Sequence, residues 1–298
     1  MNYPQSLDYL ESLVRLGIKA GLERTRKLAS AMGDPQNRYP SILVAGTNGK
    51  GSVSAFLESI LRKAGFRTGL YVSPHLVDVR ERISAGGGLI AREDFAARMT
   101  AVRQAAERVK GRPTFFEVLT LAAFDHFAQA GVDAAVLEVG LGGRLDCTNI
   151  VGPRLSVVTN IGLDHQEWLG PDLPSIAREK AGIFRRGIPA LTGSRRPVVV
   201  ETLRREALRL GTPLRFRDEM SLEPTRDGWT LNCPEGSLRL PPAPLAGRHQ
   251  LENAALAVRA ALVLREQGWE IPDSALIRGV AETRWPGRLQ QVLQSPAT

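Results

Sequence analysis

A chain of 298 residues with 43% hydrophobic and 23% charged residues has enough apolar material for one large globular domain or two modest ones. It contains no run of about 18 uncharged apolar residues, no signal-peptide pattern and only two cysteines, so we expect a cytoplasmic protein that neither crosses a membrane nor depends on disulfides. The net charge of +8 does not indicate nucleic-acid binding, because the arginines are scattered without interleaved aromatics; phosphate and carboxylate ligands explain the charge equally well.

The first half of the chain alternates helical and strand patterns. Amphipathic spacing predicts helices near residues 7–16 and 22–32. The apolar run SILVAGT from Ser41 reads as a buried strand that leads through a Gly-rich turn into a helix from Val53. The pattern continues with a strand at 67–73 and helices at 93–109 and 115–129.

The second half continues the alternation. Strands are expected at 134–139, 155–159 and 188–191, and helices at 198–210, 249–267 and 274–283. Between 214 and 240 the pattern weakens into short strands with turns at DG and PEG, which predicts a small β appendage. Alternation of this kind predicts one α/β domain with a doubly wound, mostly parallel sheet, whose strand order the sequence does not give.

The segment GTNGKGS lies where the first strand meets its helix. Glycines there allow backbone N–H groups to approach phosphate oxygens, the helix adds its positive end, and Lys50 adds a charge. The strict Walker pattern fails at Val44 and Gly51, and a Gly-rich turn with an exposed lysine is the alternative. The predicted nucleotide-binding residues are Gly46, Thr47, Asn48, Gly49, Lys50, Gly51 and Ser52.

The variant loop VAGTNGKGS resembles the nucleotide loop of the Mur-ligase superfamily, and the glycine after the lysine is similar to its folate branch. Seven further segments resemble folylpolyglutamate synthase/dihydrofolate synthase motifs in the family's order and span essentially the whole chain. They are SPHLVDVRERI, TFFEVLTLAAF, EVGLGGRLDCTN, TNIGLDH, IAREKAGI, GRHQLENAALA and WPGRLQ.

Glu138 and His165 each follow an apolar strand, where open α/β sheets bring ligand groups together. A carboxylate suits Mg²⁺, whereas a lone histidine is as often structural and is an unusual magnesium ligand. The resemblance implies that Ser73, Glu138 and His165 hold Mg²⁺ and that a carbamylated Lys180 holds a second ion. From the sequence alone, Glu138 could be a solvated or capping residue and Lys180 an exposed lysine late in a helix.

The resemblance also implies a pterin site, in which an aromatic ring stacks on the substrate and Asp146 accepts its N–H groups. The alternative for residues 114–124 is an ordinary amphipathic helix, with Phe115 in the core. Cys147 departs from the small apolar residue expected at its position. The predicted substrate-binding residues are Thr114, Phe115, Phe116, Glu117, Leu145, Asp146 and Cys147.

The implied reaction is ATP-dependent ligation of L-glutamate to dihydropteroate or folate through an acyl phosphate. Asn253 and Arg288 match ATP-contacting positions, and the predicted catalytic residues are Lys50, Glu138, His165 and Lys180. The expected partners are these small molecules only, with no nucleic acid or membrane, and monomer is the default expectation.

The resemblance places an ATP-binding domain at residues 1–289, followed by a stub at 290–298 where the family's second domain begins. We therefore expect the 298-residue chain to bind ATP–Mg²⁺ but to ligate poorly. Two alternatives stay open: a Mur-type ligase for another carboxylate substrate, and a non-catalytic ATP–Mg²⁺-binding fragment.

Overall fold

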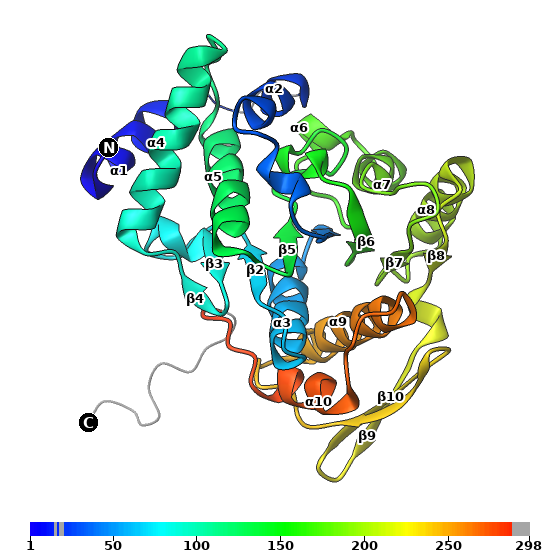
Figure 1. Cartoon of the computed structure of the whole chain (residues 1–298). Helices are drawn as coiled ribbons and strands as arrows, with labels where there is room; N and C mark the ends of the chain where they lie inside the picture. Colours follow the sequence, from blue (N-terminus) through cyan, green and yellow to red (C-terminus); the bar gives the residue numbers. More distant parts are fainter. Residues whose placement is uncertain (15–16, 18–20, 288–298) are drawn as a thin grey trace, which may run out of the picture.

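The computed structural model describes residues 1–14, 17 and 21–287. A single eight-stranded sheet crosses the molecule in the order β4-β3-β2-β5-β1-β6-β7-β8 (Figure 1). Along this order all neighbouring strands from β2 to β8 are parallel, whereas β3 is antiparallel to both of its neighbours, β2 and β4. The strands are β1 Ser41–Ala45, β2 Thr68–Tyr71, β3 Ile83–Ala85, β4 Gly88–Leu89, β5 Ala134–Glu138, β6 Pro153–Val158, β7 Ala190–Thr192 and β8 Leu214–Arg215.

Helices cover both faces of this sheet, as the doubly wound prediction requires. Helices α3, α9 and α10 pack together on one face, and α4, α5, α7 and α8 lie over the other. Each face has its own apolar core, because the central strands are buried on both sides. The helices are α1 Tyr3–Val14, α2 Glu23–Ala31, α3 Lys50–Lys63, α4 Arg92–Arg108, α5 Phe115–Ala130, α6 Gln166–Leu169, α7 Leu173–Ala181, α8 Pro197–Leu210, α9 Arg248–Glu266 and α10 Asp273–Ala281.

The predicted β appendage is a separate three-stranded antiparallel sheet of β9 Ser221–Thr225, β10 Gly228–Cys233 and β11 Gly236–Leu240. Its predicted start at 214 is wrong, because β8 is the last strand of the main sheet. Trp229 and Leu231 alternate toward the core under α9, which explains why the appendage packs against the domain.

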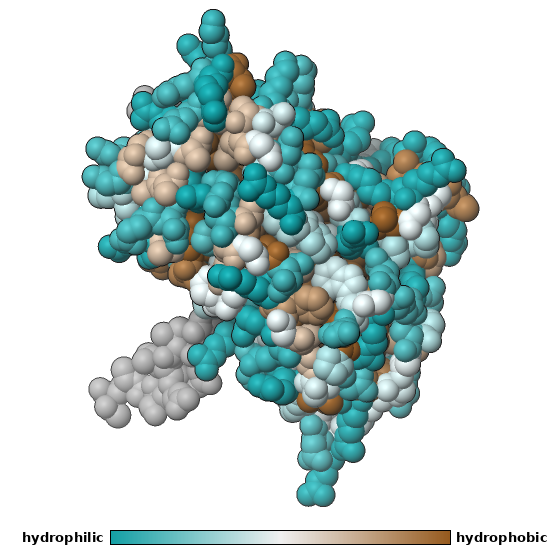
Figure 2. All heavy atoms as spheres, in the orientation of Figure 1, coloured by the Kyte–Doolittle hydropathy of each residue, from teal (hydrophilic) through white to brown (hydrophobic). Residues whose placement is uncertain are grey.

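The α/β class and the predicted parallel sheet are confirmed by this architecture. The antiparallel β3–β4 edge was not predicted. No helix among the described residues is long and apolar enough to span a bilayer. Hydrophilic side chains dominate the molecular face in Figure 2, where hydrophobic residues form small separate patches.

Candidate active site

The loop between β1 and α3 has the backbone geometry that its glycines predicted. Gly46 and Gly49 have φ angles of +151° and +84°, which residues with a Cβ rarely adopt. The amino end of α3 begins at Lys50, so its unpaired N–H groups face the loop. The Lys50 ammonium donates to the carbonyls of Gly46 and Thr47 at 3.0 and 3.1 Å. It is therefore folded over the loop where a bound phosphate would need a cation.

The segment that follows β6 holds this loop in place. The backbone N–H of Thr47 donates to the Asn160 carbonyl at 2.8 Å, and the Thr159 hydroxyl donates to the Asn48 carbonyl at 2.6 Å. A Cβ on Gly46 would lie 1.9 Å from the Thr159 hydroxyl oxygen, so only glycine fits there. The predicted loop and the predicted TNIGLDH segment thus form one structural unit.

Glu138 ends β5 beside the start of α3, as predicted. Its side chain is 3% exposed and accepts a hydrogen bond from the Ser73 backbone N–H at 3.0 Å. A Cβ placed on Gly51 would lie 3.4 Å from the same carboxylate oxygen. Ser73, Glu138 and the first turn of α3 therefore meet, which gives a hard oxygen donor next to the phosphate loop.

Lys180 is buried, and the interpretation of an exposed lysine is wrong. Only 4% of the residue is exposed, and its ammonium donates to the Gly46 carbonyl at 2.8 Å. Burial, reinforced by the charge of Lys50, lowers the pKa of Lys180 to about 8. Helix α7 thus brings a second lysine onto the phosphate loop.

The side chain of His165 contacts Asp164 rather than Lys50, Glu138 or Lys180. Its backbone has a left-handed φ of +48° at the start of α6, and its side chain is about half exposed. The imidazole lies 3.7 Å from the Asp164 carboxylate. Over the described ranges no group of three or more His, Cys, Asp or Glu side chains is arranged to hold a metal. The Glu138 carboxylate offers an oxygen donor suited to magnesium, and the parts of Ser73 and His165 in such a site stay predictions.

The predicted pterin segments converge beside this site, and the structure adds two residues to them. Glu117 forms a capping box with Thr114 at the start of α5 and accepts from Arg24 Nε at 2.8 Å on both oxygens. Thr25 donates to Glu117 at 3.0 Å and lies 3.7 Å from the Cys147 sulfur. Neither Arg24 nor Thr25 was predicted from the sequence; the signal for Arg24 was Glu117 in an apolar helix, because a buried carboxylate needs a cationic partner.

The turn after β5 is built around Asp146. This buried carboxylate accepts from the backbone N–H of Leu141 at 2.9 Å and from the Thr148 hydroxyl at 2.6 Å, while burial raises its pKa. The Phe116 ring occupies the space where a Cβ on Gly140 would stand. Asp146 is thus already well supplied with hydrogen-bond donors, and its contact with a pterin stays a prediction.

The three remaining predicted substrate-binding residues have different surroundings. Phe115 is partly buried against the core, beneath the Arg82 guanidinium, and Leu145 is 44% exposed. Cys147 is largely enclosed, and burial raises the pKa of its thiol. These surroundings suit a small apolar side chain, and a cysteine is compatible with them.

Helix α9 contacts the phosphate loop from the face of the sheet that carries α3 and α10. A Cβ on Gly49 would lie 2.5 Å from the Asn253 amide oxygen, so Asn253 stands directly against the loop. The amide nitrogen of Asn253 donates to Gln250 at 3.0 Å. The predicted ATP contact at Arg288 lies outside the described residues, although Trp285 just before it packs on Gly51.

A glycine loop contacted by two lysines beside a buried carboxylate, on a doubly wound parallel sheet, indicates a nucleotide-binding α/β domain. The Mur ligase middle domain family matches residues 44–261. The chain is 36% identical to the dihydrofolate synthase/folylpolyglutamate synthase of Bacillus subtilis, covering 99% of this chain and 71% of that protein. It is 42% identical to the Escherichia coli protein of the same name, covering 97% and 67%.

Solved structures agree with these relatives. The E. coli FolC complex with DHPP and ADP superposes with a TM-score of 0.90 at 41% identity, covering 99% of this chain and 69% of that one. An FPGS–AMPPCP–folate complex gives 0.92 at 32% identity, covering 99% and 75%. The chain belongs to the dihydrofolate synthase/folylpolyglutamate synthase family of ATP-dependent amino-acid ligases.

Proposed function

We propose that this chain binds ATP–Mg²⁺ at Gly46–Ser52 and activates the carboxylate of dihydropteroate or folate for attack by L-glutamate. The observation that carries the proposal is the convergence of Lys50, Lys180 and Glu138 on one phosphate loop. Two relatives that are 36% and 42% identical to the chain over the aligned region carry the name of this activity, and related structures contain ADP with DHPP or AMPPCP with folate.

The chemistry follows from the charges at the loop. Transfer of the γ-phosphate breaks its bond to the β-phosphate oxygen, forms an acyl phosphate on the acceptor carboxylate and releases ADP. The glutamate amine then attacks the acyl carbon, phosphate leaves with the C–O bond electrons, and the amine loses its proton. Lys50 and the N–H groups of the loop stabilise the phosphate charge, and α9 fixes the loop through Asn253.

Magnesium, when bound, would neutralise phosphate oxygens, and Glu138 with Ser73 would hold it. His165 is proposed as a further ligand on the loop after β6. These three residues lie on segments joined to the phosphate loop by the contacts described above. Asn253 is proposed as an ATP neighbour because it lies against Gly49 of the phosphate loop.

Carbamylation of Lys180 is the finer part of the proposal. Carbon dioxide reacts with a neutral amine, and a pKa near 8 leaves much more neutral amine at physiological pH than an ordinary lysine has. The amine nitrogen would bond to the CO₂ carbon and lose a proton, which leaves a carboxylate-like group for a second magnesium ion. The remaining N–H could still donate to the Gly46 carbonyl.

Ligand binding tests the assignment against other Mur-type ligases. We expect the purified chain to bind AMPPCP in a magnesium-dependent manner and, with nucleotide present, to bind dihydropteroate or folate but not a UDP-muramoyl acid. Phosphate release that depends on both folate and glutamate would test turnover separately. Binding of the UDP sugar instead, or no nucleotide binding at all, would overturn the proposal. A cytoplasmic monomer without nucleic-acid partners stays the prediction.

A further inference from the structure

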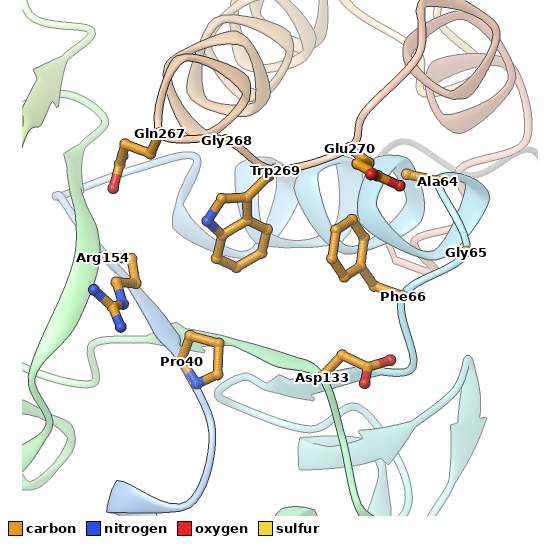
Figure 3. A pocket seen from close by; sticks show the side chains of 10 residues that line it. All are labelled: Pro40, Ala64, Gly65, Phe66, Asp133, Arg154, Gln267, Gly268, Trp269 and Glu270. Atoms are coloured by element: carbon orange, nitrogen blue, oxygen red, sulfur yellow. The ribbon is translucent and has the colours of Figure 1, made fainter.

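A second cleft lies at the other end of β1 and α3 from the phosphate loop. It has a volume of about 770 Å³ and lies between the turns that follow α3 and α9 (Figure 3). Pro40, which lines it, directly precedes β1, whereas the phosphate loop directly follows that strand. Five strand residues span roughly 16 Å, so the cleft is distinct from the proposed ATP site.

Two aromatic rings form the centre of this cleft. Phe66 and Trp269 lie with their ring centroids 5.2 Å apart at an interplanar angle of 40°, and both are partly buried against the core. In Figure 3 the two rings lie side by side in the opening, with charged side chains around them. Partly exposed aromatic surface of this kind offers a stacking face to a planar ligand.

The charges around the rings are separated in space. Arg154 lies on one side of the ring pair, and Asp133 and Glu270 lie near Phe66 on the other (Figure 3). Within the described part of the chain Arg154 has no acidic partner within ion-pair distance, while Asp133 uses one carboxylate oxygen to accept from the Arg67 backbone N–H at 2.7 Å. Helices α3 and α9 both end at this cleft, and their carbonyl ends add partial negative charge.

We propose that this cleft binds a small planar aromatic molecule with a carboxylate at one end and an ammonium group at the other. The ring stacks on Trp269 and Phe66. Arg154 pairs with the carboxylate, and Asp133 with Glu270 receives the ammonium group. This site goes beyond the proposed ligase function and does not depend on it.

The test uses 4-(aminomethyl)benzoate, a rigid aromatic zwitterion, with calorimetry or ligand-observed NMR as the readout. Benzylamine lacks the carboxylate and 4-methylbenzoate lacks the ammonium group, so each removes one of the two charge contacts. We expect the zwitterion to bind at least about tenfold more tightly than either analogue, as two charge-assisted contacts imply. Equal affinity for all three, or no saturable binding of the zwitterion, would overturn the proposal.

Variants locate the binding. Arg154→Gln should reduce zwitterion affinity to about that of benzylamine, and Glu270→Gln should reduce it toward that of 4-methylbenzoate. Arg226→Gln, an exposed arginine in the β9–β10 turn, is the matched control and should leave the affinity unchanged. An unchanged urea unfolding midpoint shows that each variant is folded. If Arg154→Gln and Glu270→Gln bind the zwitterion as the parent does, the ring pair only closes one end of the core.

Discussion

At the scale of single residues, the burial of Lys180 could not be predicted from its position in the sequence. It occupies the last turn of α7, where a lysine is usually solvated and favoured by the helix dipole. Here the side chain turns inward to the Gly46 carbonyl, next to the cationic Lys50. The nearby charge of Lys50 adds to the cost of burying a second ammonium group, so the neutral form of Lys180 is favoured relative to an ordinary lysine.

The pH dependence of stability should reveal this buried lysine. Because the folded pKa is about 8 and the ordinary value 10.5, the unfolded chain binds more protons between these pH values. Stability therefore rises with pH across that window, and the burial cost below it is about 3 kcal/mol. The free energy of unfolding is measured in urea, without bicarbonate, for the parent and for Lys180→Met. Because only the parent becomes more stable over this window, the value for Lys180→Met minus that for the parent should fall by about this amount from pH 7 to pH 10.5.

Lys27→Met is the control for this experiment, because Lys27 is largely exposed in an i,i+4 pair with Glu23. Its stability difference from the parent should stay nearly constant over the same pH range. A flat difference for Lys180→Met as well would contradict the buried, pKa-shifted lysine.

Glu138→Gln tests the proposed magnesium ligand. Glutamine keeps an oxygen that can accept the Ser73 N–H, so the fold should be retained while the negative charge is lost. We expect the gain in AMPPCP affinity on adding Mg²⁺ to fall roughly tenfold, and the affinity measured in EDTA to stay within about twofold. Glu93→Gln, an exposed residue in the first turn of α4, should change neither value. An undiminished magnesium effect in Glu138→Gln would exclude this role.

At the scale of elements, the phosphate loop depends on backbone shape as much as on charge. Gly49 precedes α3 with φ of +84°, and Asn253 of α9 fills the space next to it. The loop is thus clamped between the segment after β6 and α9, two elements that are distant in sequence. Glycine spacing predicted the loop, and the resemblance placed Asn253 at the nucleotide. The contacts of both clamps with the loop are tertiary, so local spacing could not predict them.

Gly49→Ala should distort this loop in two ways. The left-handed backbone costs an alanine about 1–2 kcal/mol, and its Cβ would meet the Asn253 amide oxygen. We expect AMPPCP affinity to fall by about tenfold or more, because both effects displace the loop. Gly131→Ala, with φ of +61° and nothing near its Cβ, is the control for backbone strain and should leave nucleotide affinity unchanged. Normal affinity in Gly49→Ala would show that the loop is freely adaptable.

At the scale of the whole molecule, the sequence predicted what is local and periodic. The buried helix and strand patterns were correct to within a few residues, because repeated apolar positions determine both element type and burial. Strands β3 and β4, only three and two residues long, carry too little pattern to predict. The pair between Arg24 and Glu117 spans 93 positions, so only the folded chain shows it.

A second long-range set of ion pairs joins the β appendage to the domain. Arg259 of α9 has no exposed side-chain surface and pairs with Glu235 in the turn after β10 and with Glu219 before β9. Glu235 is also buried, at 2% exposure, and has Arg215 as its other partner. The buried charges of Arg259 and Glu235 are therefore satisfied by each other and by Glu219 and Arg215.

Arg259→Met should loosen the appendage while the main sheet stays folded. Removing one partner of a buried pair leaves an uncompensated carboxylate and costs about 3 kcal/mol, part of which Arg215 can offset. Limited proteolysis should then cleave between residues 217 and 247 before the rest of the chain. Adding Glu235→Gln removes the buried charge and should recover part of the protection, whereas Arg239→Met, an exposed cation on β11, should have none of these effects. If Arg259→Met resists protease as the parent does, apolar packing of Trp229 and Leu231 alone holds the appendage in place.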